Sequence, residues 1–440
     1  MVWWLYNMLF TISFLLLLPR FFARMLKRGG YRKGFGQRLT WYDKNTRQAL
    51  SVNGERVWIH AVSVGELFVA LRFMETWRGT HPGTQFVLTT TTSTGHALAR
   101  AKLSAPDLLL YFPVDTPPVM RRAIRLINPR MLMLVEAELW PNLIRHCQRL
   151  QIPVVLINGR ISARSFRGYR KLGWVTRRLL PQLQAFFMQG REDAERIIAM
   201  GAPPDRVEIV GSAKYEISDR DASSEQQARQ VLDQFGYSAE HPMLLGGSTW
   251  PGEEAILLDI YQRLRKNAPN LKLILAPRHV ERSAEIIAEI EARQLSGMRR
   301  SQLNGPVEEG AVLLLDTTGE LKHFYAHADI IFVGKSLTRT EGQNIIEPAI
   351  YGKPVLIGPR VDNFQSILAD FLAADAIWQV QDQAGLEAAI ADLLADPAQR
   401  EALGRRASAL VRSKAGALQR TLDRLDGIYR EYAHRPAIVD

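Results

Sequence analysis

A glutamate lies where an expected strand gives way to an expected helix early in the chain. Residues Val57–Val62 form an apolar, β-branched run typical of a buried strand, and Leu67–Trp77 has the spacing of an amphipathic helix. Ligands of open parallel sheets bind where strand carboxyl ends meet helix N-termini, so Glu66, between the two, is placed to face a substrate. Ser63 and Glu66 also match the capping box S-x-x-E, whose side chains satisfy helix N–H groups. The local pattern leaves both interpretations open.

Two more glutamates follow another buried run. Glu136 and Glu138 come directly after the apolar strand Met131–Val135. We expect Glu136, which abuts the strand, to point into the same crevice as Glu66, where different surroundings would separate the pKa values of the two carboxyl groups. The alternative is that one carboxylate is solvated and the other caps the next helix. Lys214, at a later strand end, is placed to steady negative charge on a leaving group.

Cations and glycines at other strand ends favour an anionic ligand. Arg160 and Arg164 follow one strand, and guanidinium groups suit phosphate or carboxylate, although a solvated loop explains them equally well. In the second half, Gly246 and Gly247 would let backbone N–H groups approach a phosphate that Arg278 contacts.

Asn344 and Glu347 open a later expected helix. Asn-x-x-Glu is a serviceable helix cap, which is one interpretation. The other is that a phosphate binds at this helix N-terminus while Glu347 contacts ribose hydroxyls.

Several motifs fail on inspection. The segment Gly334–Ser336 resembles the end of a phosphate-binding P-loop, but Asp329 occupies the position of the required earlier glycine. No G-x-G-x-x-G occurs, which disfavours a dehydrogenase. The acidic pair in Asp219–Asp221 lies in a polar linker, and His323 and His327 lack a third ligand. We therefore expect no metal and no other cofactor.

Strand and helix patterns alternate through both halves of the chain. This alternation predicts two doubly wound, parallel α/β domains, with a boundary in the polar stretch Gly211–Ser224 and a helical tail from Leu386 onward. The expected strands are 57–62, 86–90, 108–112, 131–135, 154–157, 186–188 and 207–210, then 244–246, 271–276, 312–315, 330–333, 355–357 and 376–380.

Composition and the N-terminus predict an association with membranes. The formal charge is +11, hydrophobic residues make up 47%, and the single cysteine, Cys147, excludes an internal disulfide. Val2–Leu18 is a mostly apolar run that begins with interfacial aromatic residues, and the flank from Arg20 to Arg38 is basic without an acidic residue. We expect a retained anchor that leaves the rest of the chain on the cytoplasmic side, where the flank meets anionic lipid. No basic and aromatic module for nucleic acid is found elsewhere.

Several of these motifs, in this order, are similar to those of one enzyme family. The chain resembles the 3-deoxy-D-manno-octulosonic acid (Kdo) transferases of lipopolysaccharide assembly, from the anchor to about Phe364. The matching segments are His60–Glu66, Glu136–Asn142, Arg160–Ser165, Ala276–His279, Phe332–Leu337 and Asn344–Pro348.

The resemblance implies a GT-B fold, in which two Rossmann-like domains enclose a deep cleft. We expect a membrane anchor and basic flank over residues 1–40, an acceptor-binding domain over 41–217, and a CMP-sugar-binding domain over 218–440 whose last helices pack back on the first domain. The resemblance further implies CMP-Kdo as donor, a lipid A precursor as acceptor, and a location at the cytoplasmic side of the inner membrane, in contact with its phospholipid.

The resemblance also implies roles for single residues. Glu66 matches the family's general base, which takes a proton from the acceptor hydroxyl during an inverting single displacement. Glu136 and Lys214 match positions that stabilise the transition state. The segments that match the CMP-binding regions are Pro277 and Arg278, then Thr318, Gly319 and Glu320, then Asn344, Ile345, Ile346 and Glu347.

Two positions depart from the family pattern. Lys335 stands where a glycine is expected, and Gln343 replaces a histidine. Both changes fall in the region that binds the donor. Two alternatives therefore stay open: another membrane-associated GT-B glycosyltransferase with a different nucleotide-sugar donor, or a two-lobed envelope protein that binds without catalysis.

Overall fold

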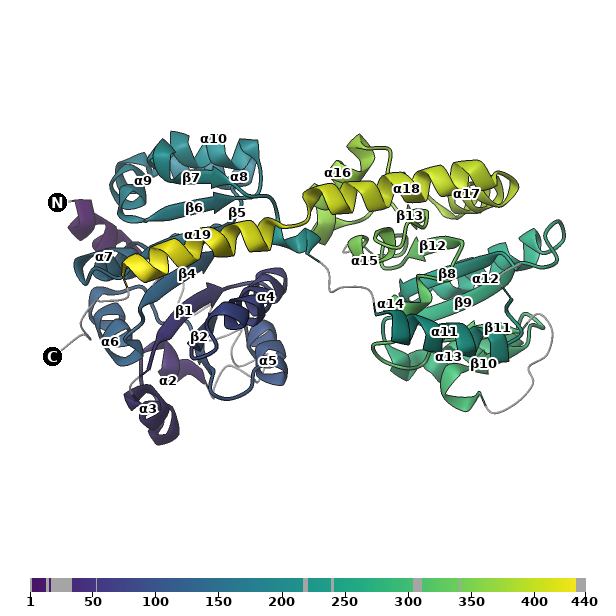
Figure 1. The fold of residues 1–440 in the computed structure, drawn as a ribbon, viewed down its shortest axis with the longest axis horizontal. Helices are drawn as coiled ribbons and strands as arrows, with labels where there is room; N and C mark the ends of the chain where they lie inside the picture. The colour runs from purple at the N-terminus through teal and green to yellow at the C-terminus, as the bar shows by residue number, and fades with distance from the viewer. Residues whose placement is uncertain are drawn as a thin grey trace. The chain divides into compact units, whose positions relative to one another are not determined.

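The chain divides into two compact units. The computed structural model describes residues 2–12, 16, 34–52, 54–216, 221–238, 241–303, 311–339 and 342–432. Unit 1 comprises Met1–Glu216 and Ala415–Asp440, and unit 2 comprises Ile217–Lys414. Both are parallel α/β units, as predicted (Figure 1).

Unit 1 is built on a seven-stranded sheet in the order β3-β2-β1-β4-β5-β6-β7. All its pairings are parallel, and β1 and β4 are buried along their whole length, which explains why they read as continuous apolar runs. The strands are β1 (Arg56–Ala61), β2 (Gln85–Thr90), β3 (Leu108–Tyr111), β4 (Met131–Val135), β5 (Val154–Gly159), β6 (Ala185–Met188) and β7 (Val207–Ile209).

Helices cover both faces of this sheet. On one face Trp58 and Leu132 pack in one apolar core, and on the other Ile59 and Met133 pack in a second core, because side chains alternate along each strand. The helices are α2 (Phe35–Arg38), α3 (Lys44–Ser51), α4 (Val64–Thr80), α5 (Ser93–Lys102), α6 (Pro117–Ile127), α7 (Pro141–Arg149), α8 (Ala163–Lys171), α9 (Gly173–Leu179), α10 (Arg191–Ala199) and α19 (Ala417–Glu431).

Helix α19 returns the end of the chain to unit 1. Its buried residues Leu418, Leu422 and Leu425 belong to the same core as Ile59. The Arg420 guanidinium also donates to the Val210 carbonyl at 2.8 Å. The yellow helix labelled α19 in Figure 1 thus completes the face that α4 and α5 cover.

Unit 2 repeats the architecture with a sheet in the order β10-β11-β9-β8-β12-β13-β14. Its strands are β8 (Met243–Thr249), β9 (Lys272–Pro277), β10 (Gly297–Arg299), β11 (Val312–Leu314), β12 (Ile330–Val333), β13 (Val355–Ile357) and β14 (Trp378–Gln379). Its helices are α11 (Ala222–Gln234), α12 (Glu253–Leu264), α13 (Ser283–Glu291), α14 (Leu321–Phe324), α15 (Ile346–Ala349), α16 (Gln365–Ala373), α17 (Gln383–Ala395) and α18 (Pro397–Lys414).

The two edge strands of unit 2 differ from the sequence prediction. Strand β10 is not predicted, because it contains glycine and arginine and no apolar run. Strand β14 covers two of the five residues predicted over 376–380, since an edge strand pairs on one side and needs less regular backbone.

Residues 2–12 form a helix that is fastened to unit 1. The Tyr6 hydroxyl donates to Asp115 Oδ2 at 3.2 Å, and the Asn142 amide donates to Asn7 Oδ1 at 2.8 Å. Within the described part of the chain, no helix has the length and apolar character needed to cross a membrane. Most of the predicted anchor and basic flank, residues 1–40, lies outside the described residues.

Candidate active site

The predicted carboxylates of unit 1 lie where its strand order reverses. Strand β1 pairs with β2 on one side and with β4 on the other, so the chain winds outward in both directions from this point. Such a reversal opens a ligand crevice at the carboxyl ends of the two strands. Glu66 follows β1 and Glu136 follows β4, so both are positioned at this edge.

Glu66 caps helix α4, as the sequence pattern predicts. Ser63 Oγ accepts a hydrogen bond from the Glu66 N–H at 3.2 Å, and Glu66 Oε1 accepts one from the Ser63 N–H at 3.3 Å. Glu66 Oε2 accepts a further one from the Val62 N–H at 2.9 Å. Each carboxylate oxygen has two lone pairs, so capping leaves Glu66 able to accept a proton.

The surroundings of Glu66 act on its pKa in opposite directions. Burial raises the pKa, hydrogen bonds from Val62 and Ser63 lower it, and the charge of Glu136 raises it. The net effect is a pKa above the ordinary value for glutamate. A raised pKa makes the ionised carboxylate a better proton acceptor at neutral pH.

Glu136 forms an ion pair with Lys214. Glu136 Oε1 lies 2.7 Å from Lys214 Nζ, and both side chains are about one-fifth exposed, at 18% and 23%. Glu136 has a φ of +60°, a left-handed conformation that is uncommon for a residue with a side chain. Backbone strain of this kind is concentrated at functional sites.

Asn158 at the end of β5 fixes the loop that carries Lys214. Its Oδ1 accepts a hydrogen bond from the Ala213 N–H at 3.0 Å, and Ser212 Oγ accepts one from the Lys214 N–H at 3.3 Å. Asn158 also has a positive φ, +51°. The adjacent strands β4 and β5 therefore both end near a residue with a strained backbone. Glu136 forms the ion pair with Lys214, and Asn158 fixes the loop that carries Lys214.

Glu138 and His60 are a second pair at this edge, and no catalytic role is predicted for either of them from the sequence. Glu138 Oε2 accepts a hydrogen bond from Trp140 Nε1 at 2.9 Å and lies 3.8 Å from His60 Nε2. Burial, and then the charges of Glu66 and Glu136, raise the pKa of Glu138 to about 7. The signal in the sequence is the spacing Glu-x-Glu, which places a second carboxyl group beside the first.

The two arginines of the β5–α8 region differ in exposure. Arg160 is partly buried. Burial raises the pKa of Asp193 above its ordinary value, and the hydrogen bond from the Ile161 N–H and the charge of Arg160 lower it in part. Arg164, in contrast, is exposed on α8.

The strand order of unit 2 reverses between β8 and β12, and a buried glutamate organises the loops there. Glu253 Oε1 accepts hydrogen bonds from the N–H groups of Ser336 and Leu337 at 2.9 and 3.0 Å. Its Oε2 accepts from the N–H groups of Lys335 and Trp250 at 2.7 and 2.9 Å. These four backbone donors are satisfied inside the protein.

Lys335 and Trp250 present side chains at this edge. Lys335 Nζ lies 4.3 Å from the centroid of the Trp250 ring, and Trp250 in turn meets His279 edge to face at 5.0 Å. Lys335 has a φ of +59°, the conformation that glycine adopts most easily. The lysine thus keeps the backbone shape of the glycine that the family pattern predicts and adds a cation.

The predicted residues Arg278 and Glu347 lie within electrostatic reach of each other. Burial raises the pKa of Glu347, whereas a hydrogen bond from Asn344 and the charges of Lys322 and Arg278 lower it. The Asn344 amide donates to Glu347 Oε1 at 3.1 Å. Lys322, on α14, is a cation of this group that the sequence analysis does not identify.

Other predicted residues of unit 2 contribute backbone rather than side chain. Pro277, Ile345 and Ile346 are buried, so their side chains pack inside the unit. Asn344 Oδ1 accepts a hydrogen bond from the Ile346 N–H at 3.0 Å, and α15 has only four residues. The N-cap residue of α15 is Ile345, and its side chain does not cap the helix, so Asn344 lies one residue before the position that the cap interpretation gives it.

The loop after β11 is the most open of the predicted segments. Thr318 and Gly319 are exposed, and Gly319 has a φ of +91°. Glu320 Oε2 accepts a hydrogen bond from Thr317 Oγ1 at 2.5 Å and lies 3.4 Å from Arg300 Nε. The chain can approach a ligand closely at Gly319, because no side chain intervenes.

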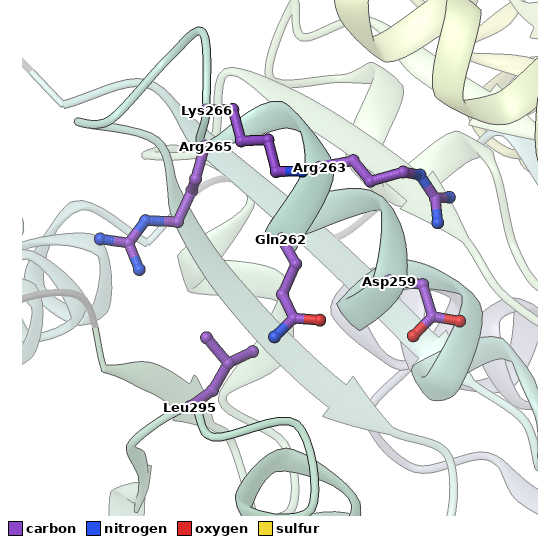
Figure 2. A pocket seen from close by; sticks show the side chains of 6 residues that line it. All are labelled: Asp259, Gln262, Arg263, Arg265, Lys266 and Leu295. Carbon is purple, nitrogen blue, oxygen red and sulfur yellow. The ribbon is translucent and has the colours of Figure 1, made fainter.

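A hollow of about 490 Å³ lies elsewhere on unit 2 (Figure 2). Helix α12 begins beside the carboxyl end of β8, so its last turn lies toward the amino ends of the strands, away from the predicted residues. The lining residues are Asp259, Gln262, Arg263, Arg265, Lys266 and Leu295. Among the residues that the structure describes, no group of three or more His, Cys, Asp or Glu could hold a metal ion.

The fold and the charged groups at its strand ends define a two-domain α/β enzyme. A UDP-GlcNAc 2-epimerase from Neisseria meningitidis has a similar fold, with a TM-score of 0.54 and 13% identity over 84% of this chain and 100% of that chain. The profile of the 3-deoxy-D-manno-octulosonic-acid transferases matches residues 33–217.

Two curated relatives bear the same name, 3-deoxy-D-manno-octulosonic acid transferase. The protein from Bordetella pertussis is 35% identical over 84% of this chain and 86% of its own length. The protein from Haemophilus influenzae is 31% identical over 91% of this chain and 92% of its own length. The chain therefore belongs to the Kdo transferase family and is a glycosyltransferase, as its resemblance to that family predicts.

Proposed function

We propose that this glycosyltransferase moves Kdo from CMP-Kdo to a lipid A precursor by a single inverting displacement of the GT-B type. The observation that carries the proposal is the edge of unit 1 where β1 and β4 end. There a buried carboxylate, Glu66, lies within electrostatic reach of the ion pair between Glu136 and Lys214. This arrangement combines a proton acceptor with a fixed positive charge.

The chemistry assigns one role to each group. The acceptor hydroxyl attacks the anomeric carbon of Kdo, its proton passes to Glu66, and the bond from that carbon to the phosphate oxygen of CMP breaks. Lys214 stabilises the negative charge that develops as the phosphate leaves, and Glu136 fixes the position of the ammonium group. One base suffices, because no covalent intermediate forms.

Residues of unit 2 hold the donor in this proposal. Arg278 and Lys322 supply positive charge for the single phosphate, and Asn344 and Glu347 supply polar groups for the nucleoside. The exposed turn at Gly319 would let the backbone approach the ligand.

The helix formed by residues 2–12 supports a membrane site for the acceptor. Its face opposite the Tyr6 and Asn7 contacts is apolar and open to solvent, and an apolar helix face of this kind inserts into the lipid interface. The exposed apolar residues are Trp4, Leu5, Met8, Leu9 and Ile12. We propose the cytoplasmic face of the inner membrane as the location, since the acceptor is a glycolipid.

The test is transfer from CMP-Kdo to the lipid A precursor by the full chain, with products identified by mass. Glu66→Gln keeps the capping hydrogen bond from the Ser63 N–H, loses the one from the Val62 N–H because its NH2 group cannot accept, and cannot take a proton. We expect transfer to fall at least about 100-fold while CMP binding stays within about threefold. Glu75→Gln, at an exposed position of the same helix, is the matched control. An active Glu66→Gln would reject the assigned base.

Competition binding decides between donors. If CMP binds more tightly than UDP and GDP, the proposed donor class stands. A preference for UDP would favour a glycosyltransferase with another nucleotide sugar. Absence of transfer from every nucleotide donor would favour a two-lobed binding protein.

A further inference from the structure

Glu138 has no task in the displacement described above, yet it lies among its charged groups. The residue sits in the loop between β4 and α7, and its side chain is 23% exposed. Trp140 Nε1 donates to its Oε2. The same oxygen is 3.8 Å from His60 Nε2, so one carboxyl group meets a hydrogen-bond donor and an imidazole together.

The imidazole of His60 offers a lone pair toward Glu138. His60 Nδ1 lies 3.1 Å from the carbonyl oxygen of Thr89, which can only accept, and 3.0 Å from Thr89 Oγ1. That hydroxyl donates its own hydrogen to the Ile59 carbonyl oxygen at 3.4 Å, so Nδ1 carries the hydrogen. Burial lowers the pKa of His60 to about 3, so the ring is neutral and Nε2 is a bare acceptor. That nitrogen is fully buried and has no hydrogen-bond partner among the residues that the structure describes. An unpaired buried acceptor costs roughly 1–3 kcal/mol.

Of the two states of Glu138, only the protonated one can satisfy this nitrogen. An ionised Glu138 would present an acceptor to an acceptor, whereas a neutral Glu138 presents an O–H. The gap of 3.8 Å closes to hydrogen-bond distance with a movement of about 1 Å.

The neighbouring carboxylates favour the same assignment of the proton. Three carboxyl groups this close cannot all be ionised without cost. Glu136 is paired with Lys214, and Glu66 accepts two backbone N–H groups, so each has partners that favour the charged form. Glu138 is the member of the three that faces a lone pair.

One further titratable group faces Glu138 from helix α8. Tyr169 donates its hydroxyl hydrogen to the Ala137 carbonyl at 3.2 Å, and burial together with the charge of Glu138 raises its pKa to about 12. It is therefore neutral and does not compete for the proton. Burial and the charges of Glu66 and Glu136 therefore raise the pKa of Glu138, the hydrogen bond from Trp140 lowers it, and His60 Nε2 is the acceptor beside it.

We propose that Glu138 is a positioning residue that carries the shared proton of this carboxylate cluster, donates it to His60 Nε2, and so leaves Glu66 ionised to act as the base. The inference rests on the proposed role of Glu66. Loss of the proton from Glu138 would add a negative charge beside Glu66, where an anionic donor must react.

The first measurement is infrared spectroscopy of the full chain as a function of pH. Wild type and the control Glu75→Gln should show the C=O stretch of a protonated carboxylic acid at pH 6, and the band should disappear as the pH rises through about 7. Burial raises the pKa of Asp115 to about 6, so Asp115 also contributes to the band in every variant. Glu138→Gln, which keeps the shape and offers a donor to His60, should lack only the part due to Glu138, which the difference spectrum against wild type isolates. In His60→Phe this part should move to the higher frequency of a more weakly hydrogen-bonded acid.

The second measurement is kcat/KM for transfer against pH. In wild type, kcat/KM should fall above pH 7 by up to about tenfold per pH unit, because only the neutral form of Glu138 is competent. Glu138→Gln should keep transfer within about threefold of wild type at pH 6 and should lack this fall, a readout that a purely structural role would not change.

The outcomes separate this inference from the proposed function. A band that is unchanged in Glu138→Gln and reduced in Glu66→Gln would place the proton on Glu66 and overturn the inference. Loss of transfer in Glu138→Gln at pH 6 would also overturn the inference. So would a band in His60→Phe at the same frequency as in wild type. If wild type transfers no Kdo, the proposed function fails, while the infrared bands still decide where the proton lies.

Discussion

Lys214 Nζ lies 2.7 Å from Glu136 Oε1, although 78 positions separate the two residues in the chain. The ion pair holds a cation at the carboxyl edge of the sheet. Glu136 adopts a left-handed backbone conformation there, with a φ of +60°, which is strained for a residue with a side chain. Because of this contact between the residues that follow β4 and β7, we propose that Lys214 of unit 1 stabilises the charge of the leaving phosphate.

Lys214→Ala should lower kcat for Kdo transfer by about 100- to 1,000-fold, because the developing phosphate charge loses a fixed partner. Steady-state kinetics with the full chain measure this loss. The matched control is Arg424→Ala, which breaks the exposed ion pair with Glu208 in the same unit and should leave kcat unchanged. Equal effects of the two substitutions would exclude a specific role for Lys214.

The free energy of unfolding should depend on pH through Glu138. Its pKa is raised in the folded state to about 7 from the ordinary 4.5, so the folded protein holds this proton at pH values where the unfolded chain has released it. The contribution is complete below pH 4.5 and is lost as the pH rises through about 7. The loss is on the order of 3 kcal/mol.

Denaturant unfolding of wild type and Glu138→Gln at several pH values isolates this contribution. The pKa of His60 is lowered to about 3, so His60 adds stability as the pH rises toward 6.5 and opposes Glu138. His60 contributes equally to both proteins, so its contribution cancels when the free energy of unfolding of Glu138→Gln is subtracted from that of wild type. A difference between the two proteins that does not change between pH 4.5 and 7 would contradict the assignment.

The helix formed by residues 2–12 should depend on its two hydrogen bonds to unit 1. We expect Tyr6→Phe to speed amide hydrogen exchange in this helix about fivefold, because one hydrogen bond contributes about 1 kcal/mol. Trp4→Ala should leave the exchange rate unchanged, since Trp4 is 69% exposed. Protection that survives Tyr6→Phe would show that the Asn7 hydrogen bond and apolar packing hold the helix without the Tyr6 contact.

Substitutions at Lys335 should separate backbone strain from its cation. Lys335→Ala keeps the left-handed conformation and loses the contact with Trp250, whereas Lys335→Gly loses the same contact but relieves the strain. We therefore expect the glycine variant to be more stable than the alanine variant by about 1 kcal/mol in thermal or denaturant unfolding. Equal stabilities would mean that the backbone at 335 relaxes when the lysine is removed.

The positions of many strands and helices could be predicted because each depends on a local pattern of apolar, polar and capping residues. The buried strands β1 and β4 read as apolar runs, and Ser63 with Glu66 reads as the capping box that the structure contains. The type and the ends of each strand or helix depend on residues within a few positions of each other, so hydrophobic periodicity and capping residues predict them.

Contacts between side chains far apart in the sequence were found only in the tertiary structure. Glu253 reads as an ordinary acidic residue in the first turn of a helix, yet it accepts the N–H groups of Ser336 and Leu337, more than 80 positions away. Likewise, His60 reads as part of a strand, and only the pairing of β1 with β4 brings it to Glu138. Strand order is decided by which faces pack together across the whole unit, and no local pattern encodes that choice.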